Sequence, residues 1–116
     1  MKKIAFTAII LLAFAGIAFA DTGGQRFSVA DAKERAENAS LVILTGHVIE
    51  DMGNRKFMFE DATGRIRLDV GFMDGGINRQ LRALRPTDLV EIFGDIHDER
   101  GPNNPIHVHV KRVTSK

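Results

Sequence analysis

The stretch Lys56-Phe-Met-Phe-Glu-Asp-Ala-Thr-Gly-Arg-Ile-Arg-Leu-Asp-Val70 contains two runs in which apolar and polar residues alternate. Successive side chains of a β-strand point to opposite faces, so the two phenylalanines of the first run share one face. The three aliphatic residues of the second run do the same. Between the runs, Asp61-Ala-Thr-Gly64 is rich in residues that favour tight turns. The stretch therefore predicts two strands that are joined by a turn and that share an apolar face.

Three further segments show the same alternation, at residues 41–48, 89–96 and 106–113. Gly46 and Gly94 lie inside the first two of these segments. A glycine inside a strand marks a sharp bend or a place where another backbone approaches closely. The chain thus contains five predicted short strands, two of which are strongly bent.

Two segments have helical character instead. Ser28 is placed to cap the first turn of a helix, with Asp31 as the acidic residue of a capping box, and this helix is expected to end near Asn38. Residues 77–84 carry apolar side chains at positions i, i+4 and i+7, which predicts one buried helical stripe before Pro86.

The order of these elements is a helix, three strands, a helical insertion and two strands. This order is typical of the OB fold, a small, partly closed Greek-key barrel. The predicted fold is therefore all-β: a five-stranded OB-fold Greek-key barrel with a short N-terminal helix and a helical turn between strands three and four.

The N-terminal residues predict an export signal. Lys2 and Lys3 precede an apolar run at residues 4–17 that is too short for a stable membrane span, and Ala18 and Ala20 supply the small residues that signal peptidases require. We expect a signal peptide over residues 1–20, cleaved after Ala20, a flexible leader over residues 21–27 and one OB-fold domain over residues 28–116. The expected location is the periplasm, with no membrane span after cleavage. This location outside the cytoplasm excludes ATP, nicotinamide cofactors and chromosomal DNA as expected ligands.

Composition narrows the possible functions further. The chain has no cysteine, which excludes disulfides, thiolate metal sites and cysteine nucleophiles. Loss of the two signal-peptide lysines leaves 14 basic against 15 acidic residues, a balance without the positive field that nucleic-acid backbones require. The charge balance therefore predicts that the chain does not bind nucleic acid. No catalytic motif is present, so we do not expect an enzyme.

The segments at residues 42–49, 57–70, 85–96 and 108–113 together resemble the bacterial OB-fold (BOF) family of exported, YgiW/YdeI-like stress-tolerance proteins. The most specific element is a Phe-x-Asp-x-x-Gly turn, here Phe59, Asp61 and Gly64. The resemblance implies a periplasmic OB barrel without known catalytic activity, with a binding role in tolerance of peroxide, metals or cationic peptides. The chain departs from the family at Gly71–Gly76, where an aromatic Trp-Asn-Gly segment is usual, and in its longer insertion before Pro86.

Arginines form the first candidate site. Arg65 and Arg67 share the outward face of the third predicted strand, and Arg79 and Arg82 form a ridge on the predicted helical turn. Guanidinium groups bind carboxylates and phosphates, so with the nearby Phe72 these residues predict a site for a small anionic molecule or an envelope component. The alternative interpretation is a solvated surface of mixed charge.

Histidines form the second candidate site. His107 and His109 share one face of the last predicted strand, where the family usually carries acidic residues, and antiparallel pairing would bring Asp95 and His97 close to them. Imidazoles with one carboxylate suit a divalent metal such as zinc or copper. The alternatives are a solvated face and a pH sensor.

These features support three functional hypotheses. The first is a periplasmic binding protein whose ligand lies on the face formed by strands two and three. The second is a divalent-metal-binding protein that uses the histidine cluster, with no other cofactor expected. The third is an interaction partner of an envelope enzyme or receptor.

Overall fold

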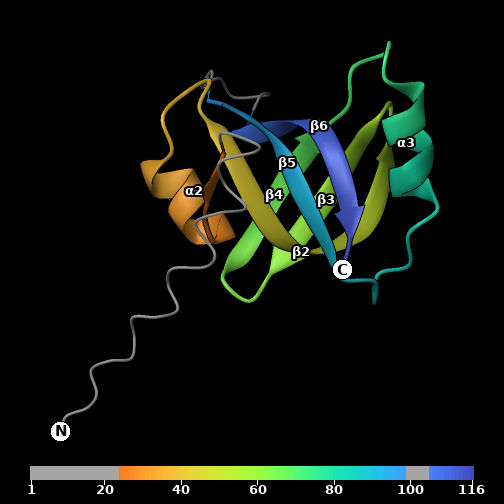
Figure 1. The fold of residues 1–116 in the computed structure, drawn as a ribbon, viewed down its shortest axis with the longest axis horizontal. Coiled ribbons are helices and arrows are strands. Elements are labelled where there is room, and N and C mark those ends of the chain that lie inside the picture. The colour runs from red at the N-terminus through yellow and green to blue at the C-terminus, as the bar shows by residue number, and fades with distance from the viewer. Residues whose placement is uncertain (1–23, 99–104) are drawn as a thin grey trace, which may run out of the picture.

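The computed structural model describes residues 24–98 and 105–116 (Figure 1). The predicted signal peptide, residues 1–20, lies outside these ranges, as do residues 21–23 of the predicted leader and part of the polar loop after His97. In the described residues the order of elements is β1, α2, β2, β3, β4, α3, β5 and β6. None of the helices in these ranges is long and apolar enough to cross a membrane.

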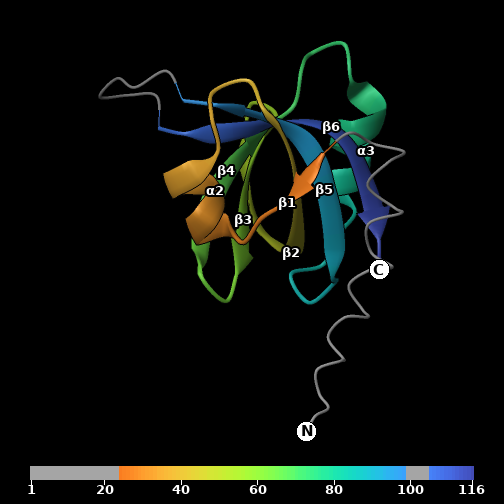
Figure 2. The same cartoon turned by 60° about the vertical axis from the view of Figure 1, so that its left-hand side comes forward.

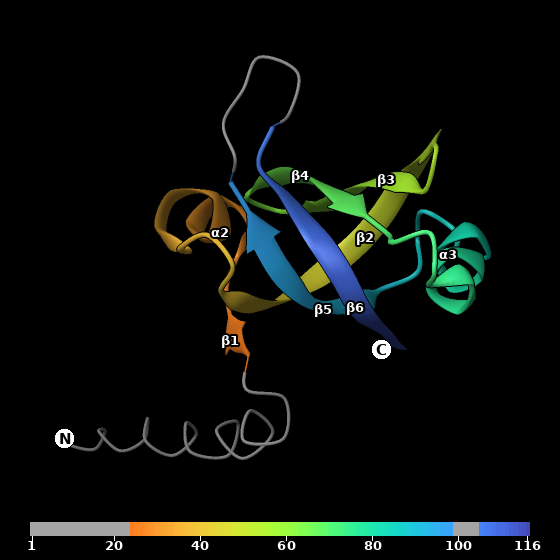
Figure 3. The same ribbon diagram turned by 90° about the horizontal axis from the view of Figure 1, so that it is seen from above.

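Five strands form a closed barrel, which Figure 3 shows from above. They are β2 (Leu41–Gly53), β3 (Lys56–Asp61), β4 (Gly64–Asp69), β5 (Val90–His97) and β6 (His107–Ser115). Strands β2, β3 and β4 are consecutive antiparallel neighbours, β4 pairs with β6 in parallel, and β5 pairs antiparallel with both β6 and β2. This is the OB topology, and the predicted fold class is confirmed.

The interior of the barrel is apolar. Phe57 and Phe59 are 1% and 0% exposed, and both belong to one cluster with the inward residues of every barrel strand. The two helices cover opposite sides of the barrel (Figure 1). They add Val29 and Ala32 from α2 (Val29–Arg35) and Leu81 from α3 (Gly75–Arg82) to the same cluster. The predicted inward faces are therefore confirmed, including the stripe on α3.

The N-terminal end of the described chain differs from the predicted flexible leader. Gln25–Arg26 forms a short strand, β1, that pairs in parallel with β2, and the N–H of Phe27 donates to the carbonyl of Ile43 at 3.1 Å (Figure 2). A Cβ atom on Gly24 would lie 2.9 Å from the Phe93 ring. The backbone of residues 24–27 thus packs on an apolar patch that local sequence patterns do not show.

Helix α2 begins as predicted, because the Ser28 hydroxyl accepts the N–H of Asp31 at 3.1 Å. It ends at Arg35, earlier than the predicted end near Asn38. The turn that follows the helix contacts β5, where the N–H of Ala39 donates to the carbonyl of Ile96 at 2.7 Å. The helix ends where Ala36 becomes extended, at φ −70° and ψ 133°, before the chain reaches β5.

Asp61, in the turn between β3 and β4, connects this turn to helix α2. Its carboxylate accepts the N–H of Val29 at 2.9 Å and the N–H and hydroxyl of Thr63 at 2.7 and 2.6 Å. Burial raises the pKa of the Asp61 carboxyl, but these hydrogen bonds outweigh burial and lower the pKa below its usual value. The aspartate of the Phe-x-Asp-x-x-Gly turn thus has a structural role.

Candidate functional site

The outer surface of β3, β4, β6 and β5 carries a set of side chains that are all polar except Met58, opposite the apolar interior. The strand registers align the outward residues of the four strands in two rows. The first row is Met58, Arg67, His107 and His97. The second row is Lys56, Asp69, His109 and Asp95. A third pair, Glu60 and Arg65, extends the set along β3 and β4. We call these residues the polar face.

The polar face brings together residues of the two predicted sites, the arginines of β4 and the histidines of β5 and β6. The parallel pairing of β4 with β6 places Arg67 beside His107 and Asp69 beside His109. These strands are far apart in the sequence, so side-chain alternation alone does not predict the contact. The third and fifth strands of an OB barrel do pair in parallel, and this rule of the fold was the signal that could have revealed it.

Asp69 is the centre of an ion-pair network on this face. The Arg67 guanidinium binds its carboxylate in a bidentate manner at 2.7 and 2.9 Å, Lys56 Nζ lies at 3.3 Å and His107 Nε2 at 3.5 Å. Burial raises the pKa of the Asp69 carboxyl, but the Arg67 hydrogen bond and the charges of His107, Arg67 and Lys56 outweigh burial and lower it below its usual value. Arg67 is only 12% exposed and is held by this carboxylate.

We expect the contribution of Asp69 to stability to disappear in acid. Because folding lowers its pKa from the ordinary value of 3.8, the ionised carboxylate stabilises the fold above that value, and this stabilisation is lost as the pH falls through the lower folded-state pKa. Urea unfolding of the wild type and Asp69→Asn should therefore show the wild type as more stable at pH 7, with the difference shrinking below about pH 4. A difference that stays constant with pH would contradict the network.

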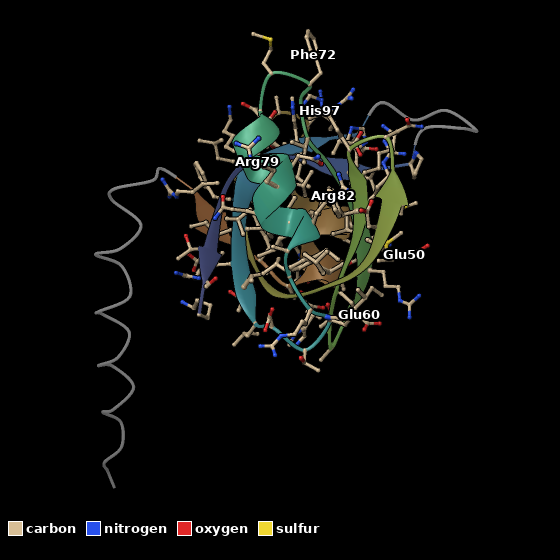
Figure 4. The ribbon with its side chains drawn as sticks, turned by 90° about the vertical axis from the view of Figure 1, so that its right-hand side faces the viewer. Glu50, Glu60, Phe72, Arg79, Arg82 and His97 are labelled. Atoms are coloured by element: carbon tan, nitrogen blue, oxygen red, sulfur yellow. The ribbon has the colours of Figure 1, made fainter. Side chains whose placement is uncertain are left out.

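The structure separates the other predicted anion-binding residues. Arg65 lies on the polar face, is 63% exposed and pairs with Glu60 at 2.9 Å. Arg79 and Arg82 lie on α3, outside the polar face, and Arg82 Nε is 3.5 Å from Asp51 Oδ2 of β2. Phe72 lies at the tip of the preceding loop and is 75% exposed (Figure 4). Arg82 is 65% exposed. Exposed ion pairs are weak, so Arg65 and Arg82 can exchange their partners for a ligand.

Three of the four predicted metal ligands come together. Asp95, His97 and His109 each offer one ligand atom, and these atoms lie within 4.8 Å of one another. His97 Nε2 is 2.7 Å from Asp95 Oδ2. All three side chains are partly exposed.

His107 lies on the same face but is 9% exposed, and its two ring nitrogens are directed elsewhere. Nδ1 is 2.9 Å from the carbonyl of Pro105, and Nε2 faces Asp69. The His107 ring stacks on the His97 ring, with a centroid distance of 5.4 Å and an interplanar angle of 10°. His107 therefore supports His97 from one side.

Two hollows adjoin the polar face, and most of the residues that line them were not predicted as site residues. One, of about 310 Å³, is lined by Asp74, His109, Val110 and Lys111. The other, of about 380 Å³, lies at the Glu60 end of the barrel, which Figure 4 shows opposite the His97 end. It is lined by Thr45, Gly46, His47, Glu60, Asp61, Ala62 and Leu89.

The closed barrel with an apolar interior and a polar outer face defines an OB-fold protein, a class generally used for binding. A family model described as "Bacterial OB fold (BOF) protein" matches residues 13–115. The chain therefore belongs to the BOF family, as its sequence motifs indicated.

Solved structures share the fold. The hypothetical protein ygiW from E. coli is 24% identical, with a TM-score of 0.62 over 81% of this chain and 92% of that chain. Asparaginyl-tRNA synthetase from Pyrococcus horikoshii is 21% identical with a TM-score of 0.62, but this chain spans only 23% of it. The OBody AM1L10, bound to hen egg-white lysozyme, is 15% identical, with a TM-score of 0.54 over 68% of this chain and 81% of that chain. The search of curated proteins found no match.

Proposed function

We propose that this BOF protein is an exported, non-enzymatic binding protein of the periplasm. It contributes to tolerance of envelope stress by binding an anionic small molecule or an anionic envelope component. The ligand contacts the polar face, at the β3 and β4 strands that carry Arg65 and Lys56. The proposal rests on the arrangement of charge on this face.

The observation that carries the proposal is that three ion pairs on and beside this face expose their positive ends, whereas in the Arg67–Asp69 pair the cation is the more buried partner, at 12% against 19%. Arg65 is 63% exposed and Glu60 39%, Lys56 is 41% exposed and Asp69 19%, and Lys111 is 54% exposed and Asp95 19%. In each of these three pairs the carboxylate lies deeper than its cation. An approaching ligand therefore meets ammonium and guanidinium groups first, which favours carboxylates and phosphates.

The ligand can use Arg65 without dismantling the barrel. Its pair with Glu60 is exposed, and such pairs contribute at most about 1 kcal/mol. A guanidinium can form two parallel hydrogen bonds with a carboxylate or phosphate, so an anionic ligand can replace Glu60. Arg67, in contrast, is 12% exposed and is bound to Asp69 of the same strand.

The test uses soluble peptidoglycan fragments, measured by thermal shift, and phosphatidylglycerol vesicles, measured by co-sedimentation, with phosphatidylcholine vesicles as the uncharged comparison. A ligand that binds only the folded state raises the melting temperature. We expect one of the two anionic probes, the peptidoglycan fragments or the phosphatidylglycerol vesicles, to bind. Arg65→Glu should lower the affinity for that probe by about tenfold or more, which corresponds to the free energy of one charge-assisted hydrogen bond.

Arg35→Glu is the matched control, because Arg35 is 72% exposed but lies on α2, outside the polar face. This variant carries the same change in net charge and should bind as the wild type does. Equal losses in the two variants, or no binding of either anionic probe, would contradict the proposal.

A further inference from the structure

We propose that Asp95, His97 and His109 form a binding site for a borderline divalent transition-metal ion such as Zn²⁺. The site lies at the β5–β6 end of the polar face. It goes beyond the proposed function, because it needs neither an anionic ligand nor the exposed arginines. The backbone register, the donor set and the contacts behind the histidines support this site.

The register of β5 and β6 brings the three side chains together. Asp95 and His109 are directly opposed cross-strand partners, and His97 is two residues beyond Asp95, on the same face of β5. Their ligand atoms lie within 4.8 Å of one another. Zinc holds nitrogen and oxygen ligands at about 2.0–2.2 Å, which places the donors of a tetrahedral site about 3.4 Å apart. Metal binding requires the donors to move to this separation, which includes parting His97 Nε2 from Asp95 Oδ2, now 2.7 Å apart.

The donor set selects a class of ion. Two imidazoles and one carboxylate suit zinc, copper(II) or nickel(II), whereas calcium and magnesium prefer sites made of oxygen atoms alone. Three protein ligands leave one position of a tetrahedral ion open. The hollow of about 310 Å³ beside His109, which Asp74 also lines, provides room for a fourth ligand there.

The loop that carries Asp74 lies next to His109. A Cβ atom on Gly71 would lie 3.2 Å from Asp74 Oδ2 and 3.3 Å from His109 Nε2, so the two side chains approach the same point. Glycine at this position therefore leaves the space between the carboxylate and the imidazole free.

Neighbouring groups hold the ligands in place. His107 stacks on His97, and His107 itself is fixed by the Pro105 carbonyl and by Asp69. Lys111 Nζ lies 3.9 Å from Asp95 Oδ1, whereas Oδ2 faces His97. Such outer contacts orient metal ligands and are worth about 10–100-fold in metal affinity. We therefore assign His107 as a positioning residue rather than a ligand.

The experiment is calorimetric titration of zinc chloride into the expressed chain, purified without a histidine tag in the form that the cell produces. We expect one saturable site per chain in the wild type. His97→Ala and His109→Ala should each lower the affinity by about 100-fold or more, beyond the range of a purely supporting residue. His107→Gln should retain a saturable site, and a loss as large as that of the ligand variants would overturn this ligand set.

His47→Ala is the matched control, because His47 is a partly buried histidine whose Nδ1 contacts the carbonyl of Asp88, outside the cluster. It should bind zinc as the wild type does. A loss equal to that of His97→Ala would show only adventitious binding to histidines, and the absence of a saturable site in the wild type would also overturn the proposal.

Two further measurements separate metal binding from folding and from the anionic ligand. Melting in EDTA checks that each variant is folded, and zinc should raise the melting temperature of the wild type but not of a folded His109→Ala variant. Arg65→Glu should retain zinc binding. The proposal of a metal site and the proposal of an anion site can therefore be contradicted independently.

Discussion

Replacement of Phe59 with alanine is expected to lower the free energy of unfolding by about 3–5 kcal/mol, which is the usual cost of removing a buried phenyl ring. Phe59 is 0% exposed, and a Cβ atom added to Gly46 would lie 2.9 Å from its ring. The ring therefore fills the space beside the glycine at the bend of β2. Small domains are stable by about 5–15 kcal/mol, so this one change removes a large share of the total.

Urea unfolding followed by circular dichroism measures this effect. Phe72→Ala is the matched control, because the Phe72 side chain is 75% exposed, and its loss should change stability by no more than about 0.5 kcal/mol. Similar small effects of the two replacements would show that Phe59 is not part of the barrel interior.

Gly94→Ala is expected to be the second strongly destabilising change, at about 1–3 kcal/mol or more. An added Cβ atom would press against the backbone carbonyl oxygen of His109 and lie 2.8 Å from the Val108 side chain. A backbone oxygen cannot rotate away, so β5 and β6 would have to separate where the register shifts between Phe93 and Gly94. The cost arises from overpacking rather than from lost contacts.

Gly76→Ala provides the comparison for this prediction. Gly76 lies in α3, and the nearest atom that an added Cβ would meet is Arg79 Nη2 at 3.9 Å. Alanine favours a helix over glycine by about 0.5–1 kcal/mol, so this variant should be at least as stable as the wild type. A Gly94→Ala protein that unfolds at the same urea concentration as the wild type would contradict the close approach of the two strands.

The barrel could be predicted because its signals are local. Alternation along each strand identifies the inward residues, and the glycines at positions 46 and 94 mark the places where strands cross closely. Both glycines do lie against neighbouring backbone: the carbonyl of Glu60 for Gly46 and that of His109 for Gly94. Strand β1 was not predicted, because a two-residue strand shows no periodicity in the sequence. Its pairing with β2 is a tertiary contact that local sequence patterns do not indicate.

The candidate site could be predicted only in part, for a related reason. The spacing of His107 and His109 places them on one face, but the directions of the His107 nitrogens depend on the Pro105 carbonyl and on Asp69 of β4. The arginines likewise share a strand face, yet Arg67 is engaged by Asp69 two residues away, whereas Arg65 is exposed. Residue type and spacing identify candidates, and the register between distant strands decides which of them are accessible.

The direct test of the polar face as a binding surface is an NMR titration of the backbone amides with the anionic probe that binds. The proposed function predicts chemical-shift changes that are concentrated in β3 and β4 around Lys56 and Arg65 and extend into β6. Changes confined to α2 and β1, with none on β3 or β4, would contradict it.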